Sequence, residues 1–285
     1  MTFTEMITIP AGAFLMGSNA GDQYSAAEEQ PQHSVYVPTF QIGKYQVTRG
    51  EYRKFLEAGG YQEQRYWSPE GWAWKEGDTV AYTGMYGVVE RVIRQHPDQP
   101  RVEPLYWAAE QDWGTNAFTQ TDLHPVVGVT YYEAEAYSKW AGARLLSEAE
   151  WEKAARWTGT HANIWPWGDS WDATKCNNSP IHIPPRGGVN KLQSLPVGSY
   201  ADGASPYGCM DMVGNGWEIV SDWAIAYPGS PEPFDHSNAF RFVRGGCWDD
   251  DEAACRCAHR GWYLPPDSAG VGPGDCDYLS FRIAR

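Results

Sequence analysis

The sequence predicts an irregular α+β fold with few helices and much loop. Three positions carry a capping box, in which a Ser or Thr side chain and a Glu three residues later satisfy each other's exposed amides at the start of a helix. The three pairs are Thr48 with Glu51, Thr130 with Glu133 and Ser147 with Glu150. Glycine (30 residues) and proline (20 residues) punctuate the stretches between these starts. Because both residues interrupt regular structure, they predict long loops.

The predicted helices and strands have definite limits. The first helix is expected to run to about Ala58 and to stop at Gly59, since glycine accepts the left-handed conformation that ends many helices. The second and third helices are expected to end near Gly142 and Gly159. Alternating apolar residues at 34–40 and 124–129 predict two short strands that lead into helices.

The chain is expected to form a single domain over residues 1–285, because no linker divides it. Residues 61–122 are expected to be an aromatic-rich insertion between the first and second helices. Five tryptophans mark this insertion: Trp67, Trp72, Trp74, Trp107 and Trp113. With 42% hydrophobic and 14% aromatic residues, the chain can build a sizeable core and keep aromatic rings for binding. Disorder is therefore not expected.

Charge and hydropathy exclude several classes of protein. The formal net charge of -14 works against nucleic-acid binding, which depends on Lys and Arg to neutralise phosphates, and against an anionic membrane surface. No stretch approaches the roughly 18 consecutive apolar residues of a membrane span. The amino terminus lacks a basic segment followed by an apolar run. We therefore expect no direct membrane insertion and synthesis in the cytosol, with a surface or phage-associated location left open.

The cysteines do not predict a metal or disulfide framework. They are Cys176, Cys209, Cys247, Cys255, Cys257 and Cys276. No Cys-x-x-Cys occurs, so a structural zinc site is not expected. We expect free or partly buried thiols.

The last part of the chain has an unusual composition. Between Cys247 and Ser280 there is no Ile, Met, Thr, Asn or Lys, although all five are frequent earlier in the chain. A segment selected only for core packing would keep β-branched and aliphatic residues, which fit a half-buried surface. We therefore predict that residues 247–280 form a surface segment.

A series of short motifs runs in one order along nearly the whole chain. They are residues 7–18 (ITIPAGAFLMGS), 31–34 (PQHS), 45–48 (YQVT), 124–129 (HPVVGV), 144–156 (RLLSEAEWEKAAR), 165–168 (WPWG), 196–199 (PVGS), 207–218 (YGCMDMVGNGWE), 243–246 (VRGG) and 281–282 (FR). With these motifs the sequence resembles the formylglycine-generating enzyme family, also called the sulfatase-modifying-factor domain. The resemblance implies a C-type-lectin-like fold of small twisted antiparallel sheets, few helices and much loop.

The resemblance also bears on catalysis. Enzymes of this family oxidise a cysteine with O2, using copper held by two thiolates shortly after the Gly-Gly motif, and soft thiolates select Cu(I). Here Cys247 replaces a usual Ser and Asp250 stands about where the first copper thiolate would be. The pair is not matched, so copper is not expected; if the chain is an enzyme, its catalytic residues are Cys247, Cys255 and Cys257. Relatives with sulfoxide synthase activity carry an added helical domain, which we do not expect here.

The family stretch that matches residues 211–218 holds a structural calcium ion. Hard oxygen donors suit Ca2+, and glycine lets the backbone turn its carbonyls inward. The implied ligands are the side chains of Asp211 and Glu218 and the carbonyls of Gly214 and Gly216. A weaker second site would use the Asn177 side chain and the Asn178 carbonyl, but its acidic partner is not evident. Hydrogen bonding of Asp211 and Glu218 to loop amides is the alternative.

The sequence is most similar to one subset of the family, the variable proteins of diversity-generating retroelements, which end just after the Phe-Arg motif. In these proteins reverse transcription changes template adenines to any base. Ile, Met, Thr, Asn and Lys are residues whose codons all begin with adenine. Their joint absence from residues 247–280 is what this process would leave. A gene rich in G and C is the alternative explanation.

We therefore expect a ligand-binding protein that contacts its target through residues 247–280. Its fixed frame is expected to consist of Trp248, Arg256, Arg260, Phe281 and Arg282. Rigid Tyr and Trp side chains commonly anchor binding surfaces. The expected ligand-binding residues are Trp248, at the border of the frame, Asp249, Asp250, Asp251, His259, Trp262, Tyr263, Leu264, Asp267, Asp275, Asp277 and Tyr278.

The acidic residues of this segment favour a basic or metal-bearing partner, either a protein or another surface ligand. A diverged copper-dependent oxidase that acts on a cysteine or thiol is the alternative function. A maturation factor that uses the same groove without chemistry is a third possibility, which the sequence does not separate from a binding protein.

Overall fold

The computed structural model describes residues 5–77, 81–84, 87–90, 100–104, 107, 120–178, 193–263 and 278–285. The helices are α1 (Arg49–Glu57), α2 (Pro69–Glu76), α3 (Tyr131–Trp140) and α4 (Glu148–Arg156), with 3-10 helices η1 (Ala27–Glu29), η2 (Gln64–Tyr66) and η4 (Ala201–Gly203). The strands are β1 (Met6–Ile9), β2 (Gly12–Met16), β3 (His33–Val37), β4 (Phe40–Gly43), β5 (Ala81–Gly84), β6 (Gly87–Glu90), β7 (Arg144–Leu145), β8 (Trp217–Trp223), β9 (Arg241–Arg244), β10 (Gly261–Tyr263), β11 (Leu279–Phe281) and β12 (Ile283–Ala284).

The described strands form two four-stranded sheets and two hairpins. One sheet has the order β1-β4-β12-β7 and the other has the order β10-β9-β8-β11, while β2 pairs with β3 and β5 with β6. Pairing is antiparallel except between β8 and β11, where Leu279 lies opposite Trp217. Because β11 and β12 follow each other directly, the last residues of the chain join the two larger sheets. The predicted α+β class with small, mostly antiparallel sheets is confirmed.

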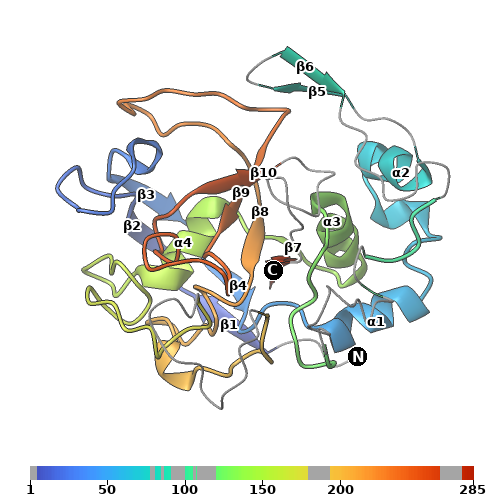
Figure 1. The fold of residues 1–285 in the computed structure, drawn as a ribbon, viewed down its shortest axis with the longest axis horizontal. Helices are drawn as coiled ribbons and strands as arrows, with labels where there is room; N and C mark the ends of the chain where they lie inside the picture. Colours follow the sequence, from blue (N-terminus) through green and yellow to red (C-terminus); the bar gives the residue numbers. More distant parts are fainter. Residues whose placement is uncertain are drawn as a thin grey trace.

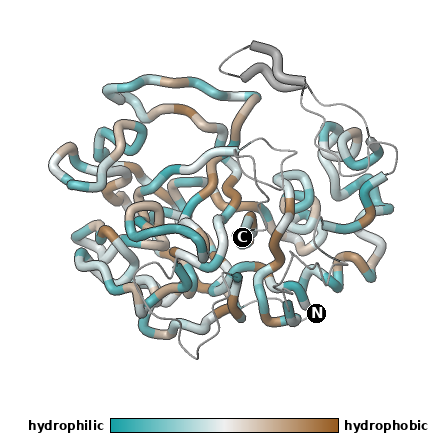
Figure 2. Tube along the Cα trace, in the orientation of Figure 1, coloured by the Kyte–Doolittle hydropathy of each residue, from teal (hydrophilic) through white to brown (hydrophobic). Residues whose placement is uncertain are grey.

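Helices flank the central strands on both sides (Figure 1). α4 and the β2–β3 hairpin lie on one side of β8, β9 and β10, and α1, α2 and α3 lie on the other. This arrangement puts α4 beside the strands that carry the carboxy-terminal segment. Figure 2 shows the hydrophobic stretches running through the central strands and the hydrophilic ones in the surrounding loops.

The predicted helix starts are confirmed. Thr48, Thr130 and Ser147 are the N-caps of α1, α3 and α4, and each closes a capping box. Glycines with positive φ follow these helices: Gly59 at 75°, Gly142 at 65° and Gly159 at 100°. The left-handed conformation of Gly59 and Gly142 ends α1 and α3 near the predicted positions, whereas α4 ends earlier, at Arg156, where Trp157 takes an extended conformation.

The structure adds a helix that the sequence analysis did not predict. α2 lies inside the predicted aromatic-rich insertion. Ser68 caps it by accepting a hydrogen bond from the Gly71 amide, Pro69 occupies its first turn, and Gly77 ends it at φ 109°. Proline at the start and glycine at the end are typical of helices, so the pattern was present in the sequence.

The strand predicted at residues 124–129 is wrong. Pro125 makes an isolated bridge to Thr48, and the Val126 amide donates to the Val47 carbonyl, but no ladder follows. Val126 and Val129 are fully buried, so the alternating apolar pattern reflects a core loop. Proline lacks the donor that an extended ladder requires. The other predicted strand, at residues 34–40, is interrupted between β3 and β4.

The first part of the predicted aromatic-rich insertion belongs to the core. Trp67 and Trp74 are buried, and Trp72 and Trp107 pack against the same cluster. Trp113 lies outside the described residues. No described helix has the length and apolar character that crossing a bilayer requires.

Candidate functional site

Four arginines in the last part of the chain are buried and form a rigid frame. Their exposed fractions are 0% for Arg244, 2% for Arg256, 3% for Arg260 and 0% for Arg282. A buried guanidinium costs much free energy unless an acid and hydrogen-bond acceptors surround it. Each of the four pairs with a buried glutamate from another part of the chain. We call these four pairs the arginine frame.

Two members of the arginine frame each hold, with two hydrogen bonds, a glutamate that no other member of the frame shares. Arg282 donates to the two Glu218 oxygens, both at 2.6 Å, and Arg256 donates to the two Glu29 oxygens at 2.7 and 2.6 Å. Such bidentate pairs fix the orientation of both side chains. Burial alone would raise the pKa of Glu29, but hydrogen bonds from His259 and Arg256 outweigh it and lower that pKa to about 2.

The other two arginines share two acids on α4. Arg260 donates to both oxygens of Glu148 at 2.8 and 2.9 Å. Arg244 donates to Glu152 at 2.5 Å and to Glu148 at 3.2 Å. Glu148 and Glu152 lie one turn apart on the helix, so α4 anchors both β9 and the residue before β10. The frame role predicted for Arg256, Arg260 and Arg282 agrees with their burial and pairing, and Arg244 is a further member that was not predicted.

Between the buried arginines, the loop 249–254 reaches the surface. Asp249 and Asp251 are exposed, and Asp250 is half-buried. Asp250 accepts a hydrogen bond from the Cys247 amide at 2.8 Å. Asp251 accepts from the amides of residues 253 and 254 at 2.9 and 3.1 Å. Two of the three predicted ligand-binding aspartates therefore also hold the turn together.

The aromatic residues predicted to bind ligand divide into buried and accessible ones. Tyr263 is fully buried and Trp248 is 3% exposed, so the prediction that they contact ligand is corrected. The reason is strand alternation, since β10 directs Tyr263 into one core cluster and its neighbour Trp262 to the opposite face, where Trp262 packs half-buried against Phe234 and His236. Trp262, His259 and Tyr278 remain half-buried. The predicted residues Leu264, Asp267, Asp275 and Asp277 lie outside the described residues.

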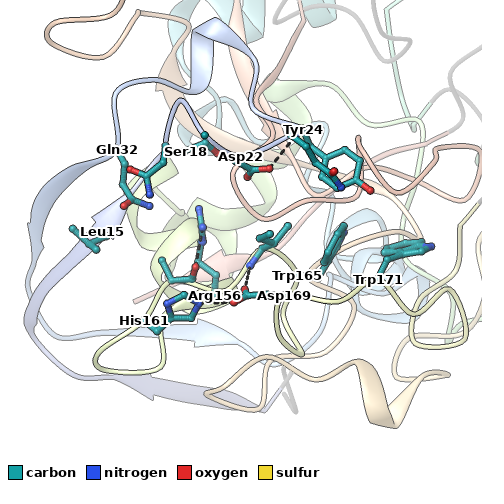
Figure 3. Close-up of a pocket in the computed structure, with 15 residues that line it drawn as sticks. Leu15, Ser18, Asp22, Tyr24, Gln32, Arg156, His161, Trp165, Asp169 and Trp171 are labelled. Atoms are coloured by element: carbon teal, nitrogen blue, oxygen red, sulfur yellow. Dashed lines mark hydrogen bonds and ion pairs between the residues drawn. The ribbon is translucent and has the colours of Figure 1, made fainter.

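A cavity of about 640 Å³ adjoins the loop 249–254 (Figure 3). Its walls are residues 15–32, around the β2–β3 connection, and residues 156–171, after α4. The Tyr24 hydroxyl donates to the Glu252 carboxylate at 2.7 Å, and Trp165 Nε1 donates to the Glu252 carbonyl at 3.2 Å. Glu252 therefore ties the loop to two residues that line the cavity. The sequence analysis missed this cavity, although the motif at 165–168 (WPWG) supplies one of its walls.

Comparison with known proteins identifies the scaffold. The model of the sulfatase-modifying factor enzyme 1-like domain matches residues 1–272. The chain belongs to this family. Hercynine oxygenase of Mycolicibacterium smegmatis is 32% identical over 278 residues, which cover 91% of this chain and 58% of that protein. Formylglycine-generating enzyme of Thermomonospora curvata is 31% identical over 288 residues, which cover 93% of this chain and 90% of that protein.

The chain spans a little over half the length of the hercynine oxygenases that it matches. Among solved structures, PvdO from Pseudomonas aeruginosa has a TM-score of 0.64 and 26% identity, and covers 99% of this chain and 94% of that chain. Treponema denticola variable protein 1 has a TM-score of 0.57 and 18% identity, and covers 98% of this chain and 94% of that chain. The predicted family and its C-type-lectin-like fold are confirmed.

In this member of the sulfatase-modifying-factor family, the three thiols after the Gly-Gly motif are buried. Cys247, Cys255 and Cys257 are 2%, 0% and 0% exposed. Burial and the nearby Asp250 raise the pKa of Cys247 well above its usual range, and burial raises the pKa of Cys257 to about 12. A hydrogen bond to Cys176, together with burial, raises the pKa of Cys255. Copper ligation needs thiolates, which this environment disfavours.

The prediction of free or partly buried thiols agrees with the structure for the described cysteines. All five cysteines of the described residues are buried and free of disulfides. Cys276 lies outside the described residues. Within the described ranges, no group of three His, Cys, Asp or Glu side chains is placed to hold a metal ion.

Three of the ligand groups implied for the first calcium site already accept hydrogen bonds from other groups of the protein. Both oxygens of Glu218 accept from Arg282. The Gly216 carbonyl accepts from Gln46 at 2.8 Å, and the Gly214 carbonyl accepts from the Gly216 amide at 2.8 Å. This arrangement does not fit a calcium ion at Glu218. Glu218 is hydrogen-bonded, as in the alternative, but its partners are the side chains of Arg282 and Trp151 and not loop amides.

The remaining implied calcium ligands are also tied into the loop. Asp211 accepts from the Gly198 amide at 2.6 Å, and burial nevertheless raises the pKa of Asp211 to about 6. The Asn177 amide donates to the Asn215 side chain at 3.0 Å, and Asn178 follows it half-buried. Calcium binding at these residues remains a prediction.

Proposed function

We propose that this chain is a ligand-binding protein that presents the loop 249–254 and the adjoining half-buried side chains from a rigid scaffold. The contrast between the buried arginine frame and the exposed Asp249 and Asp251 is the observation that carries this proposal. A binding surface gains affinity when its backbone is fixed before the ligand arrives. The binding face comprises Asp249, Asp251, His259, Trp262 and Tyr278.

We further propose that this face is diversified, as in variable proteins of diversity-generating retroelements. The missing Ile, Met, Thr, Asn and Lys between residues 247 and 280 support this proposal. The test is to sequence the DNA downstream of the gene and to search for a near-copy of the segment encoding residues 247–285. A copy that differs only at adenines, beside a reverse transcriptase gene, is expected; its absence contradicts diversification.

Ligand binding itself is tested by selection from a displayed peptide library on the immobilised protein. Peptides enriched in Lys and Arg are expected, because the face is acidic. In a double variant, Asp249→Lys with Trp262→Ala, the affinity of the selected peptides should fall at least about tenfold. Glu57→Lys is the matched control, since Glu57 is exposed at the end of α1, across the central strands from α4. Equal affinity of both variants contradicts the proposed face.

A diverged copper-dependent oxidase is the second candidate. The identities of 31% to formylglycine-generating enzyme and 32% to hercynine oxygenase favour it. So does the contact between the Cys176 and Cys255 thiols. The test is a Cu(I) titration combined with thiol-dependent O2 uptake on the wild type, Cys255→Ser and the control Cys209→Ser. Stoichiometric binding lost only in Cys255→Ser supports the oxidase, and the absence of copper binding contradicts it.

A further inference from the structure

The cavity beside the loop 249–254 lies apart from the proposed binding face. Its volume of about 640 Å³ falls within the range of small-molecule pockets in proteins. It opens between residues 15–32 and residues 156–171, and none of the five residues of the proposed face lines it. A ligand in this cavity therefore has its own set of contacts.

Each wall of the cavity carries a carboxylate (Figure 3). Asp22, on the wall of residues 15–32, accepts a hydrogen bond from the Tyr24 amide at 2.9 Å. Asp169, on the opposite wall, accepts from the Ile164 amide at 2.9 Å and lies 2.8 Å from His161 Nε2, which is charged only when protonated. Neither carboxylate is paired with Lys or Arg among the described residues. Both therefore leave negative charge at the cavity.

A third carboxylate adds to this charge from behind the Tyr24 ring. The Glu252 side chain accepts from the Tyr24 hydroxyl at 2.7 Å and forms no ion pair within the described part of the chain. The hydrogen bond to Glu252, burial and the negative charges of Glu252 and Asp22 together raise the pKa of Tyr24. Surroundings that disfavour a phenolate favour a cation, because both effects arise from the same electrostatic potential.

The arginines near the cavity are turned away from its surface. Arg156 lines the cavity but is 3% exposed, and it donates to Glu152 at 3.1 Å. Arg256 lies 5.9 Å from the centre of the Tyr24 ring, is 2% exposed and holds Glu29 with two hydrogen bonds. The two guanidinium groups are thus engaged inside the protein, whereas the carboxylates of the cavity remain half-buried or exposed. An entering ligand meets mainly the carboxylates.

One end of the cavity is aromatic. Tyr24, Trp165 and Trp171 gather there in Figure 3. The Trp165 ring packs against Tyr24 at 5.9 Å and against Trp171 at 5.4 Å between ring centroids. Trp165 is 2% exposed and supports the other two rings, which remain half-buried. Aromatic faces attract cations and also cover apolar groups, so they suit a cation that carries an apolar body.

The same surroundings do not suit a bare metal ion. Within the described residues, no three His, Cys, Asp or Glu side chains come close enough together to hold one. A cavity of about 640 Å³ is also far larger than a single ion needs. The charge and the size together indicate an organic cation.

We propose that this cavity binds an organic cation, in which an ammonium or guanidinium group is carried on an apolar body. The charged group faces Asp22 and Asp169, and the apolar body lies against Tyr24 and Trp171. Two sources share this chemistry: a small free amine, and a Lys or Arg side chain of a partner protein. The site goes beyond the proposed binding face and does not depend on it.

The experiment is isothermal titration calorimetry, with tryptophan fluorescence, on the whole chain. Tyramine and agmatine represent free amines, and the Nα-acetyl amides of lysine and arginine represent side chains of a partner. Tyrosol and 3-(4-hydroxyphenyl)propionate are the neutral and anionic counterparts of tyramine. Tyramine should bind at least about fivefold more tightly than tyrosol, and the anion more weakly still.

The outcomes separate the two sources and test the charge. Tighter binding of the capped amino acids identifies a partner side chain as the ligand, and tighter binding of the free amines identifies a small molecule. Binding of none of the four cations overturns the proposal. So does binding of tyrosol or of the anion that is as tight as that of tyramine.

Variants locate the site. Asp22→Asn and Trp171→Ala should each weaken the bound cation about fivefold. Asp22→Asn keeps a side-chain oxygen for the Tyr24 amide, so it tests the site even if the tryptophan variant folds poorly. Asp235→Asn is the matched control, because Asp235 likewise accepts at 2.9 Å from the amide two residues on, that of Ser237, and does not line the cavity. An equal effect of the two Asn variants overturns the placement. Failed peptide selection with intact tyramine binding counts against the proposed face alone.

Discussion

The arginine frame and the loop 249–254 lie close together in the sequence but differ in burial: the arginines are buried and paired, and the loop is exposed to solvent. Arg244 and Arg256 are buried and held by glutamates of distant segments, whereas Asp249 and Asp251 between them face solvent. A change in the frame leaves a buried charge without its partner, while a change in the exposed loop mainly alters what the surface presents. A scaffold of this kind can keep its fold while its binding face varies.

The largest expected effect is on the frame. Glu218→Ala leaves Arg282 buried without its acid and should lower the free energy of unfolding by about 3–5 kcal/mol. Urea denaturation measures it. The control Glu5→Ala removes an exposed pair with Lys44 and should cost less than about 1 kcal/mol. A fall of the wild-type midpoint in EDTA that Glu218→Ala does not show would indicate that Glu218 serves calcium as well.

The next effect is a pH dependence of stability. The pKa of Glu29 falls from 4.5 to about 2 on folding. An acid with a lowered folded pKa stabilises the protein above its unfolded pKa, and this contribution is lost as the pH falls toward the folded value. About 3 kcal/mol should therefore disappear between about pH 4.5 and pH 2. Urea unfolding against pH measures the loss, and Glu29→Gln should show a flatter profile. Identical profiles for wild type and variant would contradict the assignment.

A smaller effect is expected where the loop holds itself together. Asp251→Ala removes the acceptor of two backbone amides and should destabilise the protein by about 1 kcal/mol, as for a lost helix cap. Thermal or urea unfolding checks it. Asp251→Asn keeps a side-chain oxygen and should retain most of the stability. A loss as large as that of Asp251→Ala would show that the charge, and not the turn, matters.

The smallest effect on stability is expected at the open end of the loop. Asp249→Ala should change the free energy of unfolding by no more than about 0.5 kcal/mol, because the side chain is exposed. The same variant should weaken the binding of the selected basic peptides. Unfolding and peptide affinity measured on one preparation separate the two roles. A large loss of stability in Asp249→Ala would show that the exposed loop, like the arginine frame, stabilises the fold.

Local patterns in the sequence predicted the fold well where their physics is local. The capping boxes at Thr48, Thr130 and Ser147 satisfy amides within one turn, so they marked α1, α3 and α4 correctly. The pattern at 124–129 failed because alternation of apolar residues reports burial, and a core loop can be buried as completely as a strand.

The candidate site was predicted only in part for the same reason. Arg256, Arg260 and Arg282 were predicted as frame residues, but Arg244 was not, and neither were the partners Glu29 and Glu148. Arg256 and Glu29 are 227 residues apart in sequence and meet only in the folded chain. Tyr263 was taken for a surface anchor because composition does not reveal which face of a short strand points inward.

By itself the sequence determined the family, the starts of α1, α3 and α4, and the presence of a segment with a depleted composition. The tertiary structure alone decided which glutamate holds each arginine, which aromatic side chains remain accessible, and that a cavity adjoins the loop. Capping and motif order depend on neighbours along the chain. Burial, ion pairing and cavity shape depend on segments that only folding brings together, and desolvation there decides which charges must be paired.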